Sequence, residues 1–167
     1  MIESSGQIEM EHLEIRSLKP RDAPELSAML RSQQSEYARF FHPFSFDEST
    51  ISSVLSNSHR DVHTGVYLRE QLVVFFMLRG WDEGFEIPAF GILVDEKHRG
   101  HGLEILSLET AKVICKLRGA SRMMLKMHPE NISAKGVARK IGFFHVGEES
   151  GSGNIIYHCD LTRREPE

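Results

Sequence analysis

A glycine pair between cationic side chains carries the clearest chemical signal of the sequence. Gly100 and Gly102 lie in the run His98-Arg99-Gly100-His101-Gly102, directly before a helical pattern. Glycines at such positions let backbone N–H groups converge on one point, and the start of a helix adds partial positive charge. A loop of this kind binds anions, above all phosphate groups. The same spacing also occurs in a simple tight turn into a helix, so a second motif is needed to decide.

Two well-known phosphate-binding motifs do not match this loop. The dinucleotide-binding fingerprint requires a third glycine and an acidic residue at the end of a second strand, and the sequence has neither. A Walker loop requires Gly-Lys followed by Ser or Thr, which is also absent. The structural context of the loop must therefore identify its ligand.

The elements around the loop predict an α+β fold with a mixed, mostly antiparallel sheet. Pro88 lies inside the apolar run before the loop, which indicates an edge strand or a bulge. We expect parallel pairing only where a helix connects two strands, around residues 102–118. We expect strands at 12–18, 63–69, 71–79, 85–94, 121–127, 143–146 and 154–161, and helices that start at Pro20, after Asp47, at 102 and after Asn131.

Composition and charge narrow the class of protein. The chain has 167 residues, 40% of them apolar, which suits one domain with a buried core. We expect this domain at 12–161, between flexible tails at 1–11 and 162–167. A net charge of −4 disfavours nucleic-acid binding, and the longest apolar run, Leu72 to Leu78, is too short to span a membrane. With two cysteines and no signal peptide in residues 1–11, we expect a cytoplasmic protein that is a monomer or a homodimer.

Two motifs together resemble a known family. Val94 precedes Arg99-Gly100-His101-Gly102 by five residues, which is similar to the pyrophosphate-binding pattern Gln/Arg-x-x-Gly-x-Gly/Ala of the GNAT superfamily of acetyl-CoA-dependent N-acetyltransferases. Downstream, Asn131-Ile132-Ser133-Ala134 and Lys140-Ile141-Gly142-Phe143 look like the Asn-x-x-Ala and Lys-Leu/Ile-Gly-Phe elements of that family, at the usual spacing. The order of elements also agrees, so the resemblance covers about residues 12–161.

The resemblance implies an acyl-CoA N-acyltransferase with acetyl-CoA as co-substrate and no metal. It implies helices on both faces of the sheet and a splayed central pair of strands. The pyrophosphate of CoA is expected on the backbone of residues 99–103 and the pantetheine arm along the strand that ends at Val94, with Asn131 both capping its helix and contacting CoA. The cofactor-binding residues are therefore expected to be Ile92, Leu93, Val94, Arg99, Gly100, His101, Gly102, Leu103 and Asn131.

Two positions depart from the family pattern. Glu104 occupies the sixth position of the first motif, where Gly or Ala is usual, and its carboxylate competes with pyrophosphate for the same N–H groups unless it points outward. Ala138 stands where many members have a tyrosine that protonates the CoA thiolate. Another group therefore supplies this proton, or the thiolate leaves unaided.

Glu86 and Tyr157 are the expected catalytic residues. Glu86 lies thirteen residues before Arg99, on the expected strand, and resembles in position the glutamate base of the histone-acetyltransferase branch. A general base is needed because a substrate ammonium must lose a proton before it attacks a thioester. Tyr157 is the first choice for the missing acid, ahead of His158 and His128, although each of the three also suits a structural role.

The acceptor is expected to be the primary amine of a small molecule, with an amino sugar or a nucleotide amino sugar as the first candidate. This expectation rests on the aromatic segment 37–46 and on a loose resemblance of residues 80–88 to sugar-modifying members; the aromatic side chains also suit the filling of a helix–helix turn. A peptide or protein N-terminus and a non-catalytic acyl-CoA-binding module remain as alternatives. His59 and His63 have ligand-like spacing but no third ligand nearby, and neither Cys115 nor Cys159 has the neighbours of a nucleophile.

Overall fold

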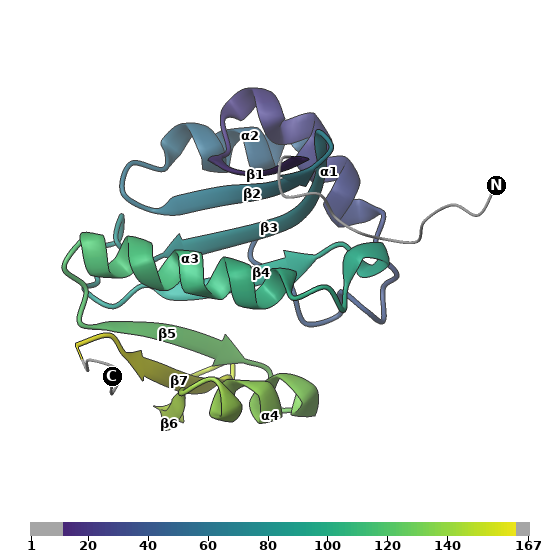
Figure 1. Ribbon diagram of the computed structural model, residues 1–167. Coiled ribbons are helices and arrows are strands. Elements are labelled where there is room, and N and C mark those ends of the chain that lie inside the picture. Colours follow the sequence, from purple (N-terminus) through teal and green to yellow (C-terminus); the bar gives the residue numbers. More distant parts are fainter. Residues whose placement is uncertain (1–11, 163–167) are drawn as a thin grey trace.

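The computed structural model describes residues 12–162 and shows a seven-stranded sheet with four α-helices (Figure 1). The expected tails at 1–11 and 162–167 lie outside this range, apart from Thr162. The strands are β1 (Leu13–Ser17), β2 (Val62–Leu68), β3 (Gln71–Arg79), β4 (Ala89–Val94), β5 (Arg122–Met127), β6 (Phe144–Glu148) and β7 (Ile155–Asp160). The helices are α1 (Ala23–Arg31), α2 (Glu48–Asn57), α3 (Leu103–Leu117) and α4 (Ile132–Lys140), and short 3-10 turns occupy Pro20–Asp22 and Glu96–His98.

The sheet is mixed and mostly antiparallel, as the sequence predicts. Its strand order is β1-β2-β3-β4-β5-β7-β6. Each neighbouring pair is antiparallel except β4 and β5, which are parallel. Helix α3 connects these two strands, because a parallel pair needs a crossover rather than a hairpin.

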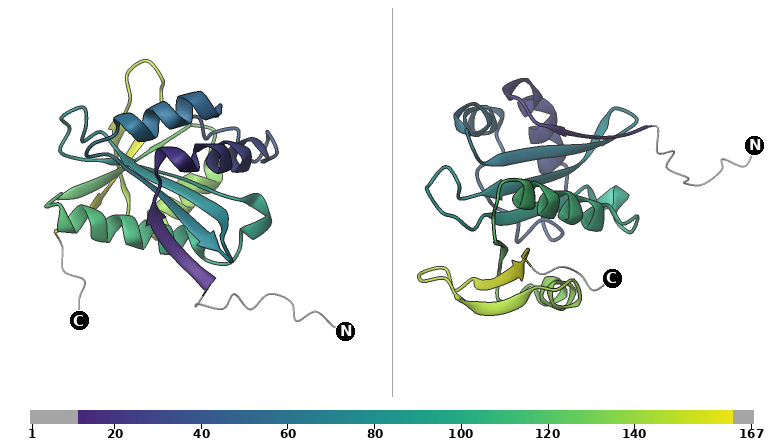
Figure 2. Two further views of the ribbon diagram at one scale, coloured as in Figure 1. Left: turned by 90° about the horizontal axis from the view of Figure 1, so that it is seen from above. Right: turned by 60° about the vertical axis from the view of Figure 1, so that its left-hand side comes forward.

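Strands β4 and β5 separate almost at once, which confirms the expected splayed pair. Their register contains one pair, Ala89 with Met124, and the N–H of Met124 donates to the carbonyl of Pro88 at 2.9 Å. Beyond this point the two strands diverge, so that β5, β7, β6 and α4 form a separate lower part of the molecule (Figure 2, right). We call the space between the diverging strands the β4–β5 gap.

Helices cover both faces of the sheet, again as expected. Helices α1 and α2 pack on one face, over a cluster that contains Phe75, Met77 and Leu93. Helices α3 and α4 share the other cluster, which contains Phe76 and Tyr157. The view from above shows α1 and α2 on one side of the sheet and α3 on the other (Figure 2, left). Within the described part of the chain, none of the helices has the length and hydrophobicity that crossing a bilayer requires.

Strand β4 is shorter than the expected strand 85–94. It begins at Ala89, directly after Pro88, and residues 85–88 form an irregular bend. Proline lacks the N–H group that a ladder needs, so the strand starts where the ladder can start. The turn before it is held by two carboxylates. Asp82 accepts the N–H groups of residues 59–61, and Asp61 accepts those of Gly80 and Asp82.

His63 is a buried histidine in β2 under the α2 side of the sheet. Its side chain stacks on Phe75 with ring centroids 6.2 Å apart, and the residue is 6% exposed. Burial, and next the charge of Arg79, lower the pKa of His63 to about 4, although Asp61 and Asp82 partly offset this shift. The ring is therefore uncharged at neutral pH.

Because the His63 ring is buried and uncharged, we expect it to lower the stability of the folded protein at acidic pH. Between about pH 6.5 and pH 4 the unfolded chain binds a proton at His63 that the folded chain does not, so stability is lost as the pH falls. The shift corresponds to about 3 kcal/mol at most, at roughly 1.4 kcal/mol per pKa unit. We expect His63→Phe to flatten the fall in melting temperature between pH 7 and pH 4.5, and the exposed-histidine control His59→Phe to keep the wild-type profile. Equal pH profiles for the two variants would contradict the assignment.

Candidate active site

The loop before α3 presents unpaired backbone N–H groups at a helix start. Gly100 and Gly102 have φ angles of 85° and 81°, in the left-handed region that favours glycine. The N–H of Leu106 bonds to the carbonyl of Gly102 at 3.0 Å, so the N–H groups of Leu103, Glu104 and Ile105 have no acceptor within the helix. No side chain caps this end of α3. The loop thus has the geometry of an anion site, as the sequence predicts.

The register of β4 decides which backbone groups face the β4–β5 gap. Leu93 pairs with Phe75 of β3, and the N–H of Asp95 donates to the carbonyl of Val73 at 2.8 Å. Because bonding direction alternates along an antiparallel ladder, Leu93 points its backbone groups toward β3, while Ile92 and Val94 point theirs toward β5.

Ile92 and Val94 therefore have backbone groups that β5 does not pair. Strand β5 has already diverged at this level, since its register with β4 ends at Ala89. These N–H and C=O groups fit the amides of an extended arm such as pantetheine. Leu93 lies in the same stretch, but its side chain is buried in the α1–α2 cluster.

The side chain of Tyr37 lies at the C-terminal end of β4. Its hydroxyl donates to the carbonyl of Val94 at 2.6 Å, and the guanidinium of Arg99 lies 5.4 Å from the centre of its ring. Burial, and next the charge of Glu104, raise the pKa of Tyr37, which keeps the phenol protonated as a donor. The sequence analysis places Tyr37 only in the aromatic segment 37–46, so this contact with β4 is a new finding.

A buried polar network fixes the loop relative to α1. Gln33 donates from Nε2 to Oδ1 of Asp95 at 2.8 Å, and its Oε1 accepts the N–H of Glu96 at 2.8 Å. Nδ1 of His98 lies 2.7 Å from the other carboxylate oxygen of Asp95. Burial raises the pKa of Asp95, but the hydrogen bonds from Gln33 and His98 outweigh it and hold the pKa below its usual value. No sequence signal links residues that lie 62 positions apart.

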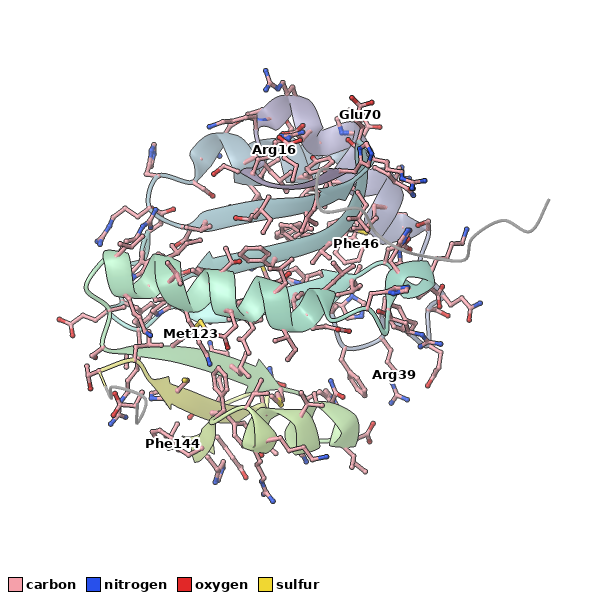
Figure 3. All side chains as sticks on the ribbon, viewed as in Figure 1. Arg16, Arg39, Phe46, Glu70, Met123 and Phe144 are labelled. Atoms are coloured by element: carbon pink, nitrogen blue, oxygen red, sulfur yellow. The ribbon has the colours of Figure 1, made fainter. Side chains whose placement is uncertain are left out.

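Residues 37–40, which we call the strap, also contact the lower part of the molecule. The ring of Phe40 stacks on His128 with centroids 4.8 Å apart. Arg39 forms an ion pair with Glu130 at 3.1 Å and lies between the upper and lower parts of the molecule (Figure 3). Since Tyr37 bonds to β4 and Phe40 contacts the end of β5, the strap crosses the β4–β5 gap on the α1–α2 side.

The two expected catalytic residues lie in different segments of the chain, one in the bend before β4 and one in β7. Glu86 is exposed and lies in the bend three residues before Ala89, rather than on a strand. Tyr157 is 2% exposed and pairs with Leu125 of β5. It belongs to the same apolar cluster as Ala138 of α4, and its ring centroid lies 5.7 Å from that of His145 in β6. Neither position tests the proposed roles.

The alternative acids have other contacts. Nδ1 of His128 accepts the N–H of Glu130 at 3.1 Å, and His158 lies on the opposite face of β7 from Tyr157, within 3.4 Å of Arg122. Asn131 accepts the N–H of Ala134 at 3.3 Å and caps α4, as expected.

The remaining candidates give no sign of metal or thiol chemistry. Among the described residues, no group of three or more His, Cys, Asp or Glu side chains is arranged to hold a metal ion. Cys115 and Cys159 are both buried, and burial raises the pKa of the Cys115 thiol to about 12. A thiol of this kind is a poor nucleophile at neutral pH.

Comparison with known proteins agrees with this geometry. The family model described as an acetyltransferase (GNAT) domain matches residues 12–144. None of the curated proteins matches the chain. Among solved structures, the PaiA N-acetyltransferase of Thermoplasma acidophilum in complex with coenzyme A superposes with a TM-score of 0.73 at 15% identity, over 89% of this chain and 98% of that one.

Two further solved structures have the same fold. The ribosomal-protein-S5-alanine acetyltransferase of Vibrio fischeri has a TM-score of 0.73 at 17% identity, over 95% of this chain and 98% of that one. The ribosomal-protein-S18-alanine N-acetyltransferase of Escherichia coli has a TM-score of 0.68 at 18% identity, over 92% and 96%. At these identities the similarity establishes the fold and leaves the acceptor open.

Glu104 provides a direct test of the anion site. Its exposed carboxylate belongs to the first turn of α3, where the free N–H groups are, and its charge acts on Tyr37 of the strap. We expect Glu104→Gln to tighten acetyl-CoA binding about 2- to 5-fold at low salt, the range that one charge at a helix end gives, and less at high salt. The matched control is Glu109→Gln on the same helix. Calorimetry that finds equal or weaker binding for Glu104→Gln would show that this carboxylate does not oppose the ligand.

Proposed function

The chain belongs to the GNAT acetyltransferase family and is an acyl-CoA N-acyltransferase, and on this basis we propose that it moves an acetyl group from acetyl-CoA to a primary amine of a small polar molecule. The observation that carries the proposal is the β4–β5 gap: backbone groups of Ile92 and Val94 face it without a strand partner, and the free N–H groups before α3 lie at the end of the same strand.

The chain's own residues divide the binding of acetyl-CoA between them. The N–H groups of Leu103 and its neighbours take the pyrophosphate, with Arg99 adding positive charge. The backbone of Ile92 and Val94 pairs with the pantetheine arm, and Asn131 lies beside it at the start of α4. A free N–H of β4 also polarises the thioester carbonyl, which favours attack by an amine.

Glu86 and Tyr157 complete the proposed transfer. The amine nitrogen forms a bond to the acetyl carbon while the carbon–sulfur bond breaks. Glu86, directly or through water, takes the proton that the amine loses. The hydroxyl of Tyr157 gives a proton to the leaving sulfur and recovers one from solvent. Tyr157 suits this role because Ala138 leaves the usual tyrosine position of α4 empty and belongs to the same cluster.

A protein N-terminus is the second candidate acceptor. Two structural relatives are named as alanine acetyltransferases of ribosomal proteins, which favours this candidate. The strap favours the small amine, because its contacts at Phe40 and Arg39 cover part of the gap on the α1–α2 side. An amino sugar is the preferred small acceptor, because a depression lined by Ser53, Asn57 and Arg79 among others offers partners for hydroxyl groups.

Thermal melting and thiol release test this function. Acetyl-CoA at about a hundred times its Kd should stabilise the protein by ~2–3 kcal/mol, and ATP should not. Amines and peptides that are acceptors should then release free CoA, measured with a thiol reagent. Because Cys115 and Cys159 are buried, the native protein should contribute little background. No stabilisation by acetyl-CoA would refute the proposal, and stabilisation without CoA release from any amine would indicate a binding module.

Glu86→Gln tests the base. We expect kcat/KM at pH 7 to fall about 10²–10⁴-fold, because the amide cannot accept the proton, and to recover as the pH approaches the pKa of the acceptor amine. The Kd for acetyl-CoA should not change. Glu83→Gln, an exposed carboxylate in the preceding turn, is the matched control. Full activity of Glu86→Gln across pH 6–9 would exclude Glu86 as the base.

Tyr157→Phe tests the acid. We expect kcat to fall about tenfold, at the low end for general acid catalysis since a thiolate is a fair leaving group, with the KM for acetyl-CoA unchanged. Adding Ala138→Tyr to Tyr157→Phe should restore part of the rate, because it places a phenol at the usual family position. Melting curves check that both variants fold. An unchanged kcat for Tyr157→Phe would assign Tyr157 to the core alone.

A further inference from the structure

A polar depression of about 500 Å³ lies between α2 and the ends of β2 and β3. Five of the residues that line it come from α2, namely Ser49, Thr50, Ser53, Val54 and Asn57. The opposite wall contains Asp61 and His63 from the β2 side and Arg79 from the end of β3. Its lining is rich in hydroxyl, amide and charged groups and poor in apolar side chains.

The lining offers donors and acceptors without a net charge. Asp61 uses one carboxylate oxygen to accept the N–H groups of Gly80 and Asp82. Arg79 donates one N–H to the carbonyl of Pro43, and its guanidinium has further N–H groups. The charges of Asp61 and Arg79 balance, and His63 is uncharged because burial lowers its pKa to about 4.

His63 gives an independent sign that a ligand belongs here. The residue is 6% exposed, and its Nε2 is buried with no hydrogen-bond partner in the described structure. A buried polar atom left unpaired is unfavourable, and in native proteins such atoms usually have a protein, water or ligand partner. A hydroxyl group can fill this role in either direction, because it both donates and accepts.

The depression adjoins the β4–β5 gap through the register of the sheet. On the α1–α2 face, His63 pairs with Met77, and Met77 pairs with Gly91 of β4. Two strand spacings separate His63 from Gly91, which is roughly 10 Å. A Cβ at Gly91 would lie 2.6 Å from Cε of Met77, so the buried side chain of Met77 covers Gly91 and separates His63 from it on this face. Arg79 likewise pairs with Ala89, where β4 and β5 begin to diverge.

We propose that this depression binds the neutral, hydroxyl-bearing ring of a sugar, with α2 on one side and His63 and Arg79 on the other, so that the amine of an amino sugar extends past Arg79 toward Ala89, where the β4–β5 gap begins. The placement of the amine rests on the proposed acetyl transfer, whereas the sugar site stands on the depression alone. The balanced charge disfavours a polyamine or a phosphate.

Nuclear magnetic resonance of the histidine rings tests the site without any turnover. The full chain, labelled in its histidines and free of acetyl-CoA, is titrated with glucosamine and with N-acetylglucosamine. We expect the ring signals of His63 to shift and saturate with the sugars, while those of His59 stay in place. An alanine-initiated peptide and spermidine are the comparison ligands. Sugars that leave His63 unmoved, or a peptide or polyamine that alone shifts it, would overturn the proposal.

Two single substitutions in α2 test whether the sugar binds in the depression. Ser53→Phe places a ring in the depression, and Ser56→Phe places the same ring on α2 at an exposed position that does not line it. Ser53→Phe should weaken sugar binding in the same titration by about tenfold or more, because the ring occupies volume that the ligand needs. Ser56→Phe should not. Equal affinities of the two variants would place the sugar elsewhere, and melting curves confirm that both fold.

Different experimental results would refute the proposed sugar site and the proposed acetyl transfer. If the sugars shift His63 but acetyl-CoA does not stabilise the protein, the sugar site stands and the proposed function falls. If a peptide releases CoA while sugars leave His63 unmoved and Ser53→Phe keeps the wild-type rate, acetyl transfer stands and the sugar site falls. If glucosamine releases CoA, its KM should rise at least about tenfold in Ser53→Phe, with the KM for acetyl-CoA unchanged.

Discussion

The structure depends on backbone hydrogen bonds that β4 and β5 do not make. A parallel pair in the middle of a sheet is normally bonded along its length, yet these two strands meet only at Ala89 and Met124. The groups of Ile92 and Val94 that face β5 then need other partners, since unpaired backbone polar groups are unfavourable away from water. Tyr37 satisfies the carbonyl of Val94. The rest fit an extended ligand, so the divergence that weakens the sheet also creates the site.

The N-terminal part of the chain holds this divergence in place. Gln33 and Asp95 join the end of α1 to the loop before α3, and the strap reaches from β4 to His128. These contacts are buried or aromatic, and they replace some of the cohesion that strand pairing would have provided. Helix α1 and the strap therefore position the glycine loop as well as cover the sheet. Loss of α1 packing would disturb the anion site from a distance.

Much of the fold was predictable because local patterns control it. Alternating and continuous apolar runs located the strands, Asn131 and Asp47 cap helices as their types suggest, and the glycines before α3 have the backbone angles that the motif requires. The rest depended on contacts between distant residues. Gln33 has no local feature that points to Asp95, and Pro88 signalled an irregularity without showing that the strand would start only after it. The position of Glu86 in a bend follows from that second fact.

The two carboxylates that brace the turn before β4 connect the proposed base to the proposed acceptor site. Asp82 binds the backbone ahead of β2, and Asp61 binds the backbone after β3, so the two connections move as one unit. The connection before β2 contains Asp61 and leads to His63 of the depression. The connection after β3 leads to Glu86. Such bracing matters for transfer chemistry, because a small error in the distance between base and amine reduces the rate strongly. Glu86 is exposed and in an irregular segment, yet its position is tied to the wall that we propose holds the acceptor.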